Sequence, residues 1–403
     1  MASDSESSAP PIDDVPVAGE QTALLSATKP GDAHTPHRSA APRETGGRWA
    51  VGIPRSPPPH NQHLLPQAIA HRGYKVAAPE NSLLAFSLAV DDARAHAVET
   101  DLHLSRDGVV VLSHDATLKR CYGRDEKVCD LDWEGGLSEL RTTRKVEGKG
   151  EGEPMARLVD LLVLLNEGGR EGVWVMLDVK RDNDPTEIMR RTAETIASVP
   201  GVRPWNERIM ICCWSAQFIK AAQTHLPAYP LANVGVSTFY TRALSSHLPH
   251  LSLSMLRFPL AMPLLGRIFI RDMRRKGHPI HAWTINDEGW MRWCVRMRFD
   301  GVITDDPKTF LAVCAEMGGD GDDDEAKRQK EERERKAGRG GGGGGGERGG
   351  IRGLITSPVT SARRRAKACV EWALHLVIIA TIMVVYFYRW GFPGRSVRKT
   401  LEG

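Results

Sequence analysis

AIAHRGYKVAAPENSLLAFSLAVDDARAHAVETDLHL, residues 68–104, decides the fold because it joins two β-rich runs through one helical stretch. The first run is AIAHRG, and the second, AVETDLHL, occupies residues 97–104. Between them, residues 81–96 read NSLLAFSLAVDDARAH, a helix-like pattern of apolar and polar residues. This order predicts a strand–helix–strand unit, the building block of α/β folds with parallel sheets.

The same alternation continues from about residue 66 to residue 317. The further β-rich runs are VVVLSHD (109–115), VWVMLDVK (173–180), RIMICCW (208–214), PLANVGV (230–236), LSLSMLRF (251–258), PIHAWTIN (279–286) and GVITDD (301–306). Most of them are separated by helix-like segments. Eight or nine strands within about 250 residues suit a (β/α)₈ TIM barrel better than an open sheet. We therefore predict an α/β TIM barrel over residues 66–317.

The segments outside the barrel have a different composition. Residues 1–65 are rich in Pro, Ser, Ala and Gly and are predicted to be disordered, with an acidic start that shows no targeting signal. Residues 318–371 combine a mixed-charge stretch with an unbroken glycine run, which predicts a flexible linker. The seven cysteines lack disulfide or metal spacing, which excludes a secreted disulfide scaffold and a structural zinc module.

The positive charge of the chain lies at its C-terminal end. Residues 347–403 carry a formal charge of +7 against +4 for the whole protein, so the remainder is negative and a nucleic-acid-binding core is not expected. Residues 372–388, WALHLVIIATIMVVYFY, are mostly apolar with aromatic residues at the edges, which predicts a transmembrane anchor. A helix lying in the membrane interface is the alternative. A basic tail, 389–403, follows.

This anchor, if it spans the membrane, defines an expected location. Because residues 372–388 lie near the C-terminal end, they are made after the barrel. We expect them to insert after the barrel has been synthesised, which would leave the barrel in the cytosol. The expected membranes are the endoplasmic reticulum, the outer mitochondrial membrane or the surface of lipid droplets. We expect the membrane to be a partner of the protein through this C-terminal helix.

The first candidate site residues end the first predicted strand. His71 and Arg72 lie in AHRG, and strand C-terminal ends form the catalytic face of a barrel. A histidine can transfer a proton, and an arginine beside it can bind a phosphate through its planar fork of donors. The tripeptide His-Arg-Gly also occurs by chance, so its meaning depends on the other motifs.

A second cluster follows in AVETDLHL. Glu99 and Asp101 point to the same face of a strand, which makes half of a site for a divalent cation. Asp107-Gly108 predicts a hairpin with a two-residue turn, and that register places His114 opposite Asp101. The alternative is a surface hairpin whose polar side chains face solvent.

The remaining candidates lie on later strands. Asp178 and Lys180 share one face at the end of an otherwise apolar strand, and buried charges seldom occur without partners. They suit a third metal carboxylate and a phosphate-binding cation, and a structural salt bridge is the alternative. Trp283 could form an apolar wall of the site or belong to the core. No Walker loop, dinucleotide fingerprint or nucleophile elbow is present.

Together these motifs resemble the glycerophosphodiester phosphodiesterase family. The matching text, in the family's order, is AHRG with Pro79-Glu80-Asn81-Ser82, then ETDLHLSRDG, VVLSHDATLKR, LDVK, WTIN and DGVITDDP. The resemblance implies a TIM barrel with a divalent metal cation, usually Mg²⁺ or Ca²⁺. It implies that Glu99, Asp101 and the acid at 178 hold this metal, and that His71 and His114 are the general acid and base.

The resemblance also implies roles for four further residues. Arg72 and Lys180 would bind the substrate phosphate, while Glu80 and Asn81 match the family's motif close to the site. One position departs from the pattern, because most members carry Glu where this chain has Asp178. The shorter side chain puts the choice and the position of the metal in doubt.

Within the family, the chain is similar to fungal phospholipases C specific for phosphatidylglycerol. The similarity lies in MLDVK, PWNERI and GVITDDP together with the apolar C-terminal segment. It implies a phospholipid substrate, phosphatidylglycerol, cleaved to diacylglycerol and glycerol phosphate. The alternatives are a phosphodiesterase for soluble, deacylated phospholipids and, in another class, an inactive membrane-tethered lipid-binding protein.

Overall fold

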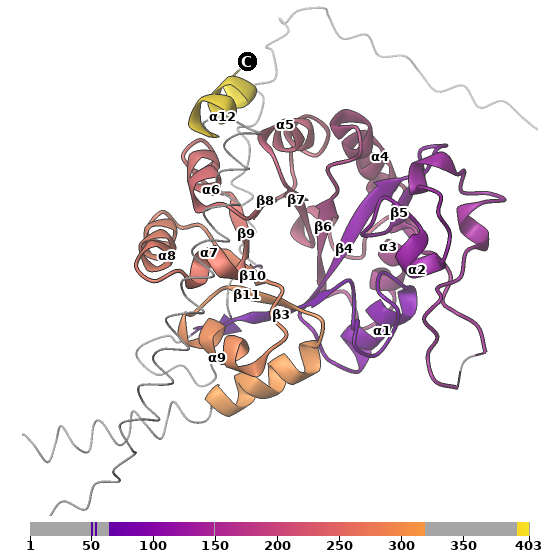
Figure 1. Ribbon diagram of the computed structural model, residues 1–403, viewed down its shortest axis with the longest axis horizontal. Helices are drawn as coiled ribbons and strands as arrows, with labels where there is room; N and C mark the ends of the chain where they lie inside the picture. Colours follow the sequence, from indigo (N-terminus) through magenta and orange to yellow (C-terminus); the bar gives the residue numbers. More distant parts are fainter. Residues whose placement is uncertain (1–49, 51–52, 55–63, 149, 319–392, 403) are drawn as a thin grey trace, which may run out of the picture. The chain divides into compact units, whose positions relative to one another are not determined.

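The structure, a computed structural model, describes residues 50, 53–54, 64–148, 150–318 and 393–402 (Figure 1). The predicted disordered segment 1–65 and linker 318–371 lie almost entirely outside these residues, and the predicted membrane segment 372–388 lies entirely outside. These three assignments therefore stay predictions. Within the described residues, no helix is both long enough and apolar enough to cross a bilayer.

Eight parallel strands close into a barrel, as the alternating pattern predicts. They are β3 (Gln67–His71), β4 (Ala97–Leu104), β6 (Trp174–Val179), β7 (Ile209–Cys213), β8 (Leu231–Gly235), β9 (Ser252–Leu256), β10 (Ile280–Trp283) and β11 (Gly301–Thr304). β11 pairs with β3, with Thr304 opposite Ala70, and β3 pairs with β4, so the sheet has no free parallel edge. The prediction of a TIM-like barrel is confirmed.

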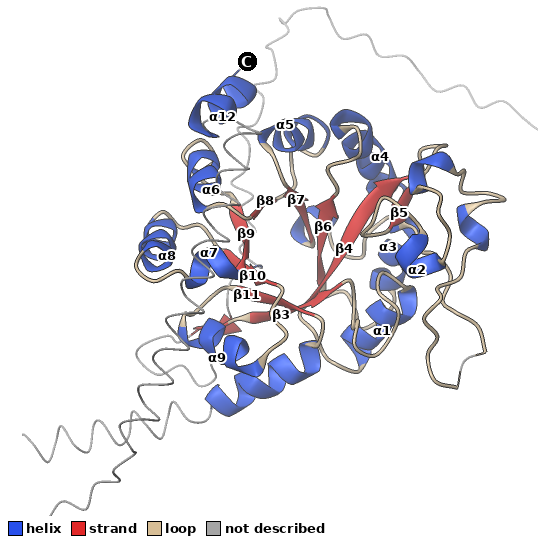
Figure 2. Ribbon diagram, viewed as in Figure 1, coloured by secondary structure: helices blue, strands red, loops and turns tan. Residues whose placement is uncertain are grey.

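Helices cover the outside of this ring of strands (Figure 2). They are α1 (Leu83–Asp91), α2 (Lys119–Tyr122), α3 (Leu158–Asn166), α4 (Pro185–Ser198), α5 (Ala216–His225), α6 (Thr238–Ser245), α7 (Arg257–Ala261), α8 (Leu265–Arg275), α9 (Glu288–Arg296) and a helix that begins at residue 307. Local sequence signals start several of them. The Ser82 and Ser237 hydroxyls and the Asp184 and Asp287 carboxylates accept backbone hydrogen bonds as N-caps.

The two main core clusters lie on the two faces of the sheet. The larger one lies between strands and helices and is built from apolar side chains of both, such as Val98 on β4 and Phe86 on α1. The smaller one fills the barrel and includes Ile69, Ala97, Met176, Met210 and Ile303. Apolar side chains on both faces explain why these strands are continuous hydrophobic runs.

The hairpin after β4 differs from the prediction. Leu104 pairs with Val110, which shifts the expected register by one residue and leaves a three-residue connection, 106–108. Gly108 takes a φ of +82°, whereas Asp107 is not among the residues with positive φ, so a turn that needs positive φ at both positions does not form. The Ser105 hydroxyl closes the loop by accepting a hydrogen bond from the Val109 N–H at 2.8 Å.

This register removes the expected pairing of His114 with Asp101. Ser113 lies in that place, and its N–H donates to the Asp101 carbonyl at 3.0 Å. β5 (Val110–Leu112) ends before His114, so His114 lies in the long connection between β5 and α3. The connection, not the strand ladder, determines where its imidazole points.

The last described helix lies in the predicted basic tail. α12 (Pro393–Glu402) packs against α5 and α6 (Figure 1). Val397 is 1% exposed and belongs to the main core cluster, and Leu401 packs against the same cluster. The Glu402 carboxylate lies 3.8 Å from Nε2 of His247, just beyond the end of α6. The tail is therefore part of the folded body.

Gly73 provides a test of the turn after β3. Its φ is +83°, and a Cβ there would lie 2.7 Å from the carbonyl carbon of Ala85 in α1. Gly277 has a similar φ of +80°, but a Cβ added to it would meet no heavy atom within 4 Å. We expect Gly277→Ala to cost about 1 kcal/mol of unfolding free energy for its backbone alone. Gly73→Ala should cost at least ~2 kcal/mol more, because backbone atoms must move.

Thermal and denaturant unfolding of the two variants would measure this difference. Equal losses of stability in Gly73→Ala and Gly277→Ala would contradict the close approach of the turn to α1.

Candidate active site

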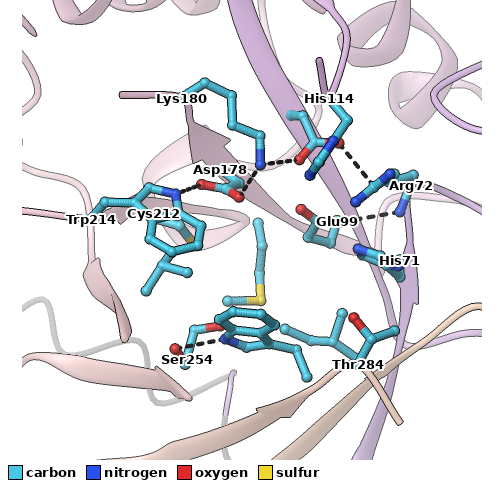
Figure 3. A pocket seen from close by; sticks show the side chains of 15 residues that line it. His71, Arg72, Glu99, His114, Asp178, Lys180, Cys212, Trp214, Ser254 and Thr284 are labelled. Carbon is cyan, nitrogen blue, oxygen red and sulfur yellow. Dashed lines mark hydrogen bonds and ion pairs between the residues drawn. The ribbon is translucent and has the colours of Figure 1, made fainter. Parts of the chain in front are cut away.

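A cavity of about 100 Å³ opens at the carboxyl ends of the barrel strands (Figure 3). Eight of the ten predicted site residues line it: His71, Arg72, Glu99, Asp101, His114, Asp178, Lys180 and Trp283. The other two, Glu80 and Asn81, bind lining residues from behind. The structure therefore brings the whole predicted set together around one cavity.

Strand register explains why three carboxylates meet there. His71, the last residue of β3, pairs with Glu99 on β4, and Asp101 on β4 pairs with Asp178 on β6. Glu99 and Asp101 are two residues apart and therefore face the same side of the strand. Neighbouring parallel strands end at one edge of the barrel, so the acidic side chains converge at its mouth.

The three carboxylates form a buried, coupled cluster. Glu99, Asp101 and Asp178 each offer an oxygen within 4.8 Å of the other two. Burial raises the pKa of Glu99 well above its usual value, and the charges of Asp101 and Asp178 raise it further. Burial acts on Asp101 in the same direction, but the charges of Lys180 and Arg72 outweigh it and lower its pKa.

This donor set fits a hard divalent cation. Carboxylate oxygens from several strands are the ligands that Mg²⁺ and Ca²⁺ use in proteins. Lys180 and Arg72 bring two positive charges against these three carboxylates, one fewer than full ionisation of the cluster requires. A bound cation would supply the missing positive charge, and Glu99, Asp101 and Asp178 are the residues that would hold it.

Two cations lie against the cluster. Nζ of Lys180 contacts Oδ1 of Asp101 and Oδ2 of Asp178, both at 2.6 Å (Figure 3). Burial opposes the charge on Lys180, but these carboxylates outweigh it and raise its pKa. The backbone N–H of Arg72 donates to Oε2 of Glu99 at 3.0 Å, and its guanidinium Nε lies 3.2 Å from Oδ2 of Asp101.

Glu80 and Asn81 position these groups. The Asn81 amide donates to Oδ2 of Asp101 at 2.9 Å, and the Arg72 guanidinium donates to Glu80 at 2.8 Å. Arg120 also donates to both oxygens of Glu80, at 2.7 and 2.8 Å. Burial opposes ionisation of Glu80, yet the two arginines outweigh it and lower its pKa to about 2. Glu80 therefore stays charged and links Arg72 to Arg120.

His71 is oriented by a carboxylate that the sequence analysis did not assign to the site. Its Nδ1 lies 2.5 Å from Oδ1 of Asp305, which follows β11, the neighbour of β3. The Asn286 amide donates to the other oxygen of Asp305 at 2.8 Å. Burial opposes ionisation of Asp305, but the contact with His71 and the charge of Lys75 lower its pKa to about 2. The signal was present in WTIN and GVITDDP, the motifs that carry Asn286 and Asp305.

His114 also lines the cavity and has its own carboxylate. Its Nδ1 lies 2.7 Å from Oδ1 of Asp115, and Asp115 accepts from Nε of Arg120 at 2.6 Å. Burial lowers the pKa of His114, although the charge of Asp101 partly offsets this effect. Because Arg120 also holds Glu80, one arginine positions His114 and, through Glu80, Arg72. Sequence analysis gave Arg120 no role.

Two indole rings form the apolar wall of the cavity. Trp214 and Trp283 meet edge to face, with ring centroids 5.8 Å apart. Both line the cavity and pack against the inner core of the barrel, so Trp283 belongs to the site and to the edge of the core. Trp214 also has a polar role, because its Nε1 donates to Oδ1 of Asp178 at 2.6 Å. Trp214 was not predicted, although it ends the run RIMICCW beside the strand that carries Asp178.

Sequence comparison shows the family of this chain. Residues 71–309 match the model of the glycerophosphoryl diester phosphodiesterase family. A glycerophosphodiester phosphodiesterase from Caldanaerobacter subterraneus subsp. tengcongensis is 26% identical over 248 residues, covering 60% of this chain and 95% of that protein. A probable glycerophosphodiester phosphodiesterase 2 from Mycobacterium tuberculosis is 29% identical over 251 residues, covering 59% and 86%. The chain belongs to the glycerophosphoryl diester phosphodiesterase family, whose members generally depend on a divalent metal.

Solved structures share the fold. A putative glycerophosphoryl diester phosphodiesterase from Silicibacter pomeroyi aligns with a TM-score of 0.56 at 17% identity, covering 68% of this chain and 98% of that one. A phosphodiesterase from Oleispira antarctica, solved with its product sn-glycerol-3-phosphate, aligns with a TM-score of 0.52 at 23% identity, covering 62% and 96%.

Trp214 gives a prediction for metal binding. In Trp214→Phe, Asp178 loses the hydrogen bond that fixes Oδ1, so its carboxylate is less well oriented. We expect divalent-cation affinity to fall about 10- to 100-fold, the usual effect of losing a hydrogen bond to a ligand. Calorimetric titration with Mg²⁺ and with Ca²⁺ measures it. Trp283→Phe is the matched control, because its Nε1 donates instead to the Ser254 carbonyl at 2.9 Å. Equal affinities in both variants would contradict this role.

Proposed function

We propose that this protein hydrolyses glycerophosphodiesters by acid–base catalysis with His71 and His114 next to a metal site. One observation carries the proposal: each histidine is backed by a carboxylate, and the two lie around one cavity with Lys180 and Arg72. Two cations can neutralise a phosphodiester while two histidines move protons. A divalent cation held by Glu99, Asp101 and Asp178 would act as a Lewis acid on a phosphoryl oxygen.

The two histidines differ in ways that suit different roles. The pKa of His114 is lowered by burial, so its ring is neutral near neutral pH and can accept a proton from the attacking hydroxyl. Asp305 holds Nδ1 of His71 and fixes the ring orientation, which leaves Nε2 to protonate the leaving oxygen. A glycerol head group carries a hydroxyl next to the ester, and its attack would give a cyclic phosphate that water then opens.

Within this chemistry, we infer that the substrate is phosphatidylglycerol, cleaved in the manner of a phospholipase C. The sequence similarity to fungal phosphatidylglycerol-specific phospholipases supports this, and so does the apolar wall of Trp214 and Trp283 beside the phosphate-binding cations. Hydrolysis of soluble, deacylated diesters is the second candidate. It is supported by the two related proteins, which are named glycerophosphodiester phosphodiesterases. Both routes yield glycerol phosphate, the product bound in the Oleispira phosphodiesterase.

A substrate panel separates these possibilities. Phosphatidylglycerol, phosphatidylinositol, phosphatidylcholine, glycerophosphoglycerol and glycerophosphocholine would each be incubated with the full chain, with and without chelator. We expect turnover of phosphatidylglycerol that chelation abolishes, with diacylglycerol and glycerol phosphate as products. Turnover of the deacylated diesters alone would favour the second candidate. No turnover of any diester with Mg²⁺ or Ca²⁺ present would indicate an inert lipid-binding protein.

The histidines give a second test. His71→Ala and His114→Ala should each lower turnover at least ~10²-fold, the usual scale of general acid–base catalysis. His247→Ala is the matched control, since this exposed histidine lies beyond α6 and does not line the cavity. Steady-state kinetics on folded variants, checked by circular dichroism, measure the effect. Near-normal turnover in either site variant would remove that histidine from the mechanism.

A further inference from the structure

Exposed apolar side chains gather on one part of the barrel. Of the nine large hydrophobic residues that the described part of the chain exposes, six lie between residues 236 and 268. One of these, Phe258, packs against the Arg257 guanidinium. The other five are called the apolar rim: Val236, Phe239, Leu264, Leu265 and Ile268.

The apolar rim lies at the mouth of the active-site cavity. Val234 on β8 and Ser254 on β9 pair in register, and both line the cavity. The chain leaves the barrel just beyond them, so Val236 and Phe239 follow the end of β8. Leu264, Leu265 and Ile268 follow β9, around the start of α8. Figure 1 shows α6, α7 and α8 in succession along this side of the ring.

The rim presents its side chains to solvent at a conformational cost. Leu264 is 69% exposed and has a φ of +58°, a region that bulky residues rarely adopt. Phe239 is 52% exposed at the start of α6. Contiguous exposed apolar residues at a functional opening usually mark a surface that contacts lipid or protein.

Charge distinguishes between these partners. α8 exposes Arg267, Arg271 and Arg275, for which no ion pair occurs within the part of the chain that the structure describes. Its acidic residue, Asp272, is neutralised by Arg242 at 3.0 Å. At 1.5 Å per residue, Arg267 lies about 3 Å along α8 from Leu265, within a Debye length of it, and Arg271 lies about 9 Å along the helix. Apolar side chains next to unpaired arginines match an anionic lipid surface.

We propose that the apolar rim and the arginines of α8 form a docking face for an anionic lipid bilayer. Phe239, Leu264 and Leu265 enter the head-group region, and Arg267 and Arg271 contact lipid phosphates. Docking in this orientation turns the cavity mouth toward the bilayer, where the phosphodiester of a lipid lies. This inference rests on the proposed function, because it explains how a membrane-bound substrate reaches His71 and His114.

Hydrogen exchange on the full chain tests the docking face locally. Vesicles of phosphatidylglycerol should protect peptides covering residues 236–240 and 262–268, and vesicles of phosphatidylcholine should protect them much less. Peptides covering Val163 and Val202, which are exposed elsewhere on the barrel, should not change. Hydrogen exchange reports on each peptide separately. Binding of vesicles through any other segment would therefore not protect peptides 236–240 and 262–268.

Variants provide the second measurement. The triple variant Phe239→Ser, Leu264→Ser, Leu265→Ser removes apolar side chains of the rim. Its partition coefficient onto phosphatidylglycerol vesicles should fall at least about tenfold. Its turnover of vesicle phosphatidylglycerol should fall similarly, while turnover of soluble glycerophosphoglycerol stays unchanged. Val163→Ser with Val202→Ser is the matched control and should behave as the unmodified chain. Arg267→Gln with Arg271→Gln should reduce the preference for anionic over zwitterionic vesicles.

The outcomes separate this inference from the proposed function. Turnover of soluble diester without vesicle protection of the rim overturns the docking face and leaves the proposed function in place. Rim protection without turnover of any diester supports docking and overturns the proposed function. Rim peptides that are already protected without vesicles would show that a second copy or another segment covers them, which also overturns the inference.

Discussion

Three buried carboxylates whose oxygens lie within 4.8 Å of one another are the constraint on which the polar structure of this barrel depends. Two unit charges 4 Å apart repel by about 4 kcal/mol at an effective dielectric constant of 20, so Glu99, Asp101 and Asp178 need compensation. Lys180 and Arg72 supply two positive charges against these three carboxylates, so the compensation by the protein is incomplete when all three are ionised. A site with residual negative charge is prepared for a cation and, through that cation, for a phosphate.

Asp178 shows how a departure from the family pattern is accommodated. Its carboxylate is one methylene shorter than the Glu that most members carry, so it has less reach into the cavity. Trp214 donates to one oxygen and Lys180 to the other, which fixes the short side chain between them. The indole that follows β7 therefore takes part in holding the shorter side chain in place.

Sequence patterns predicted the barrel because each strand carries its own signal. All nine β-rich runs form strands, and their ends bring Glu99 and Asp178 to one edge by register alone. The pattern failed where a side chain decides the geometry, as when Ser105 closes the hairpin and shifts its register. It also missed Asp305, because its contact with His71 joins residues 234 positions apart. Arg120 was missed for a different reason: it lies in the long connection between β5 and α3, which no strand or barrel periodicity describes.

The docked helix α12 has a topological consequence. Residue 318 and α12 belong to the same folded body, so residues 319–392 begin and end on it. If residues 372–388 crossed a membrane once, α12 would lie on the opposite side of that membrane from the barrel, and Val397 would have to leave the core. If the same residues lay along the membrane interface, Val397 could stay buried. The burial of one valine thus links the C-terminal end of the described chain to the integrity of the barrel.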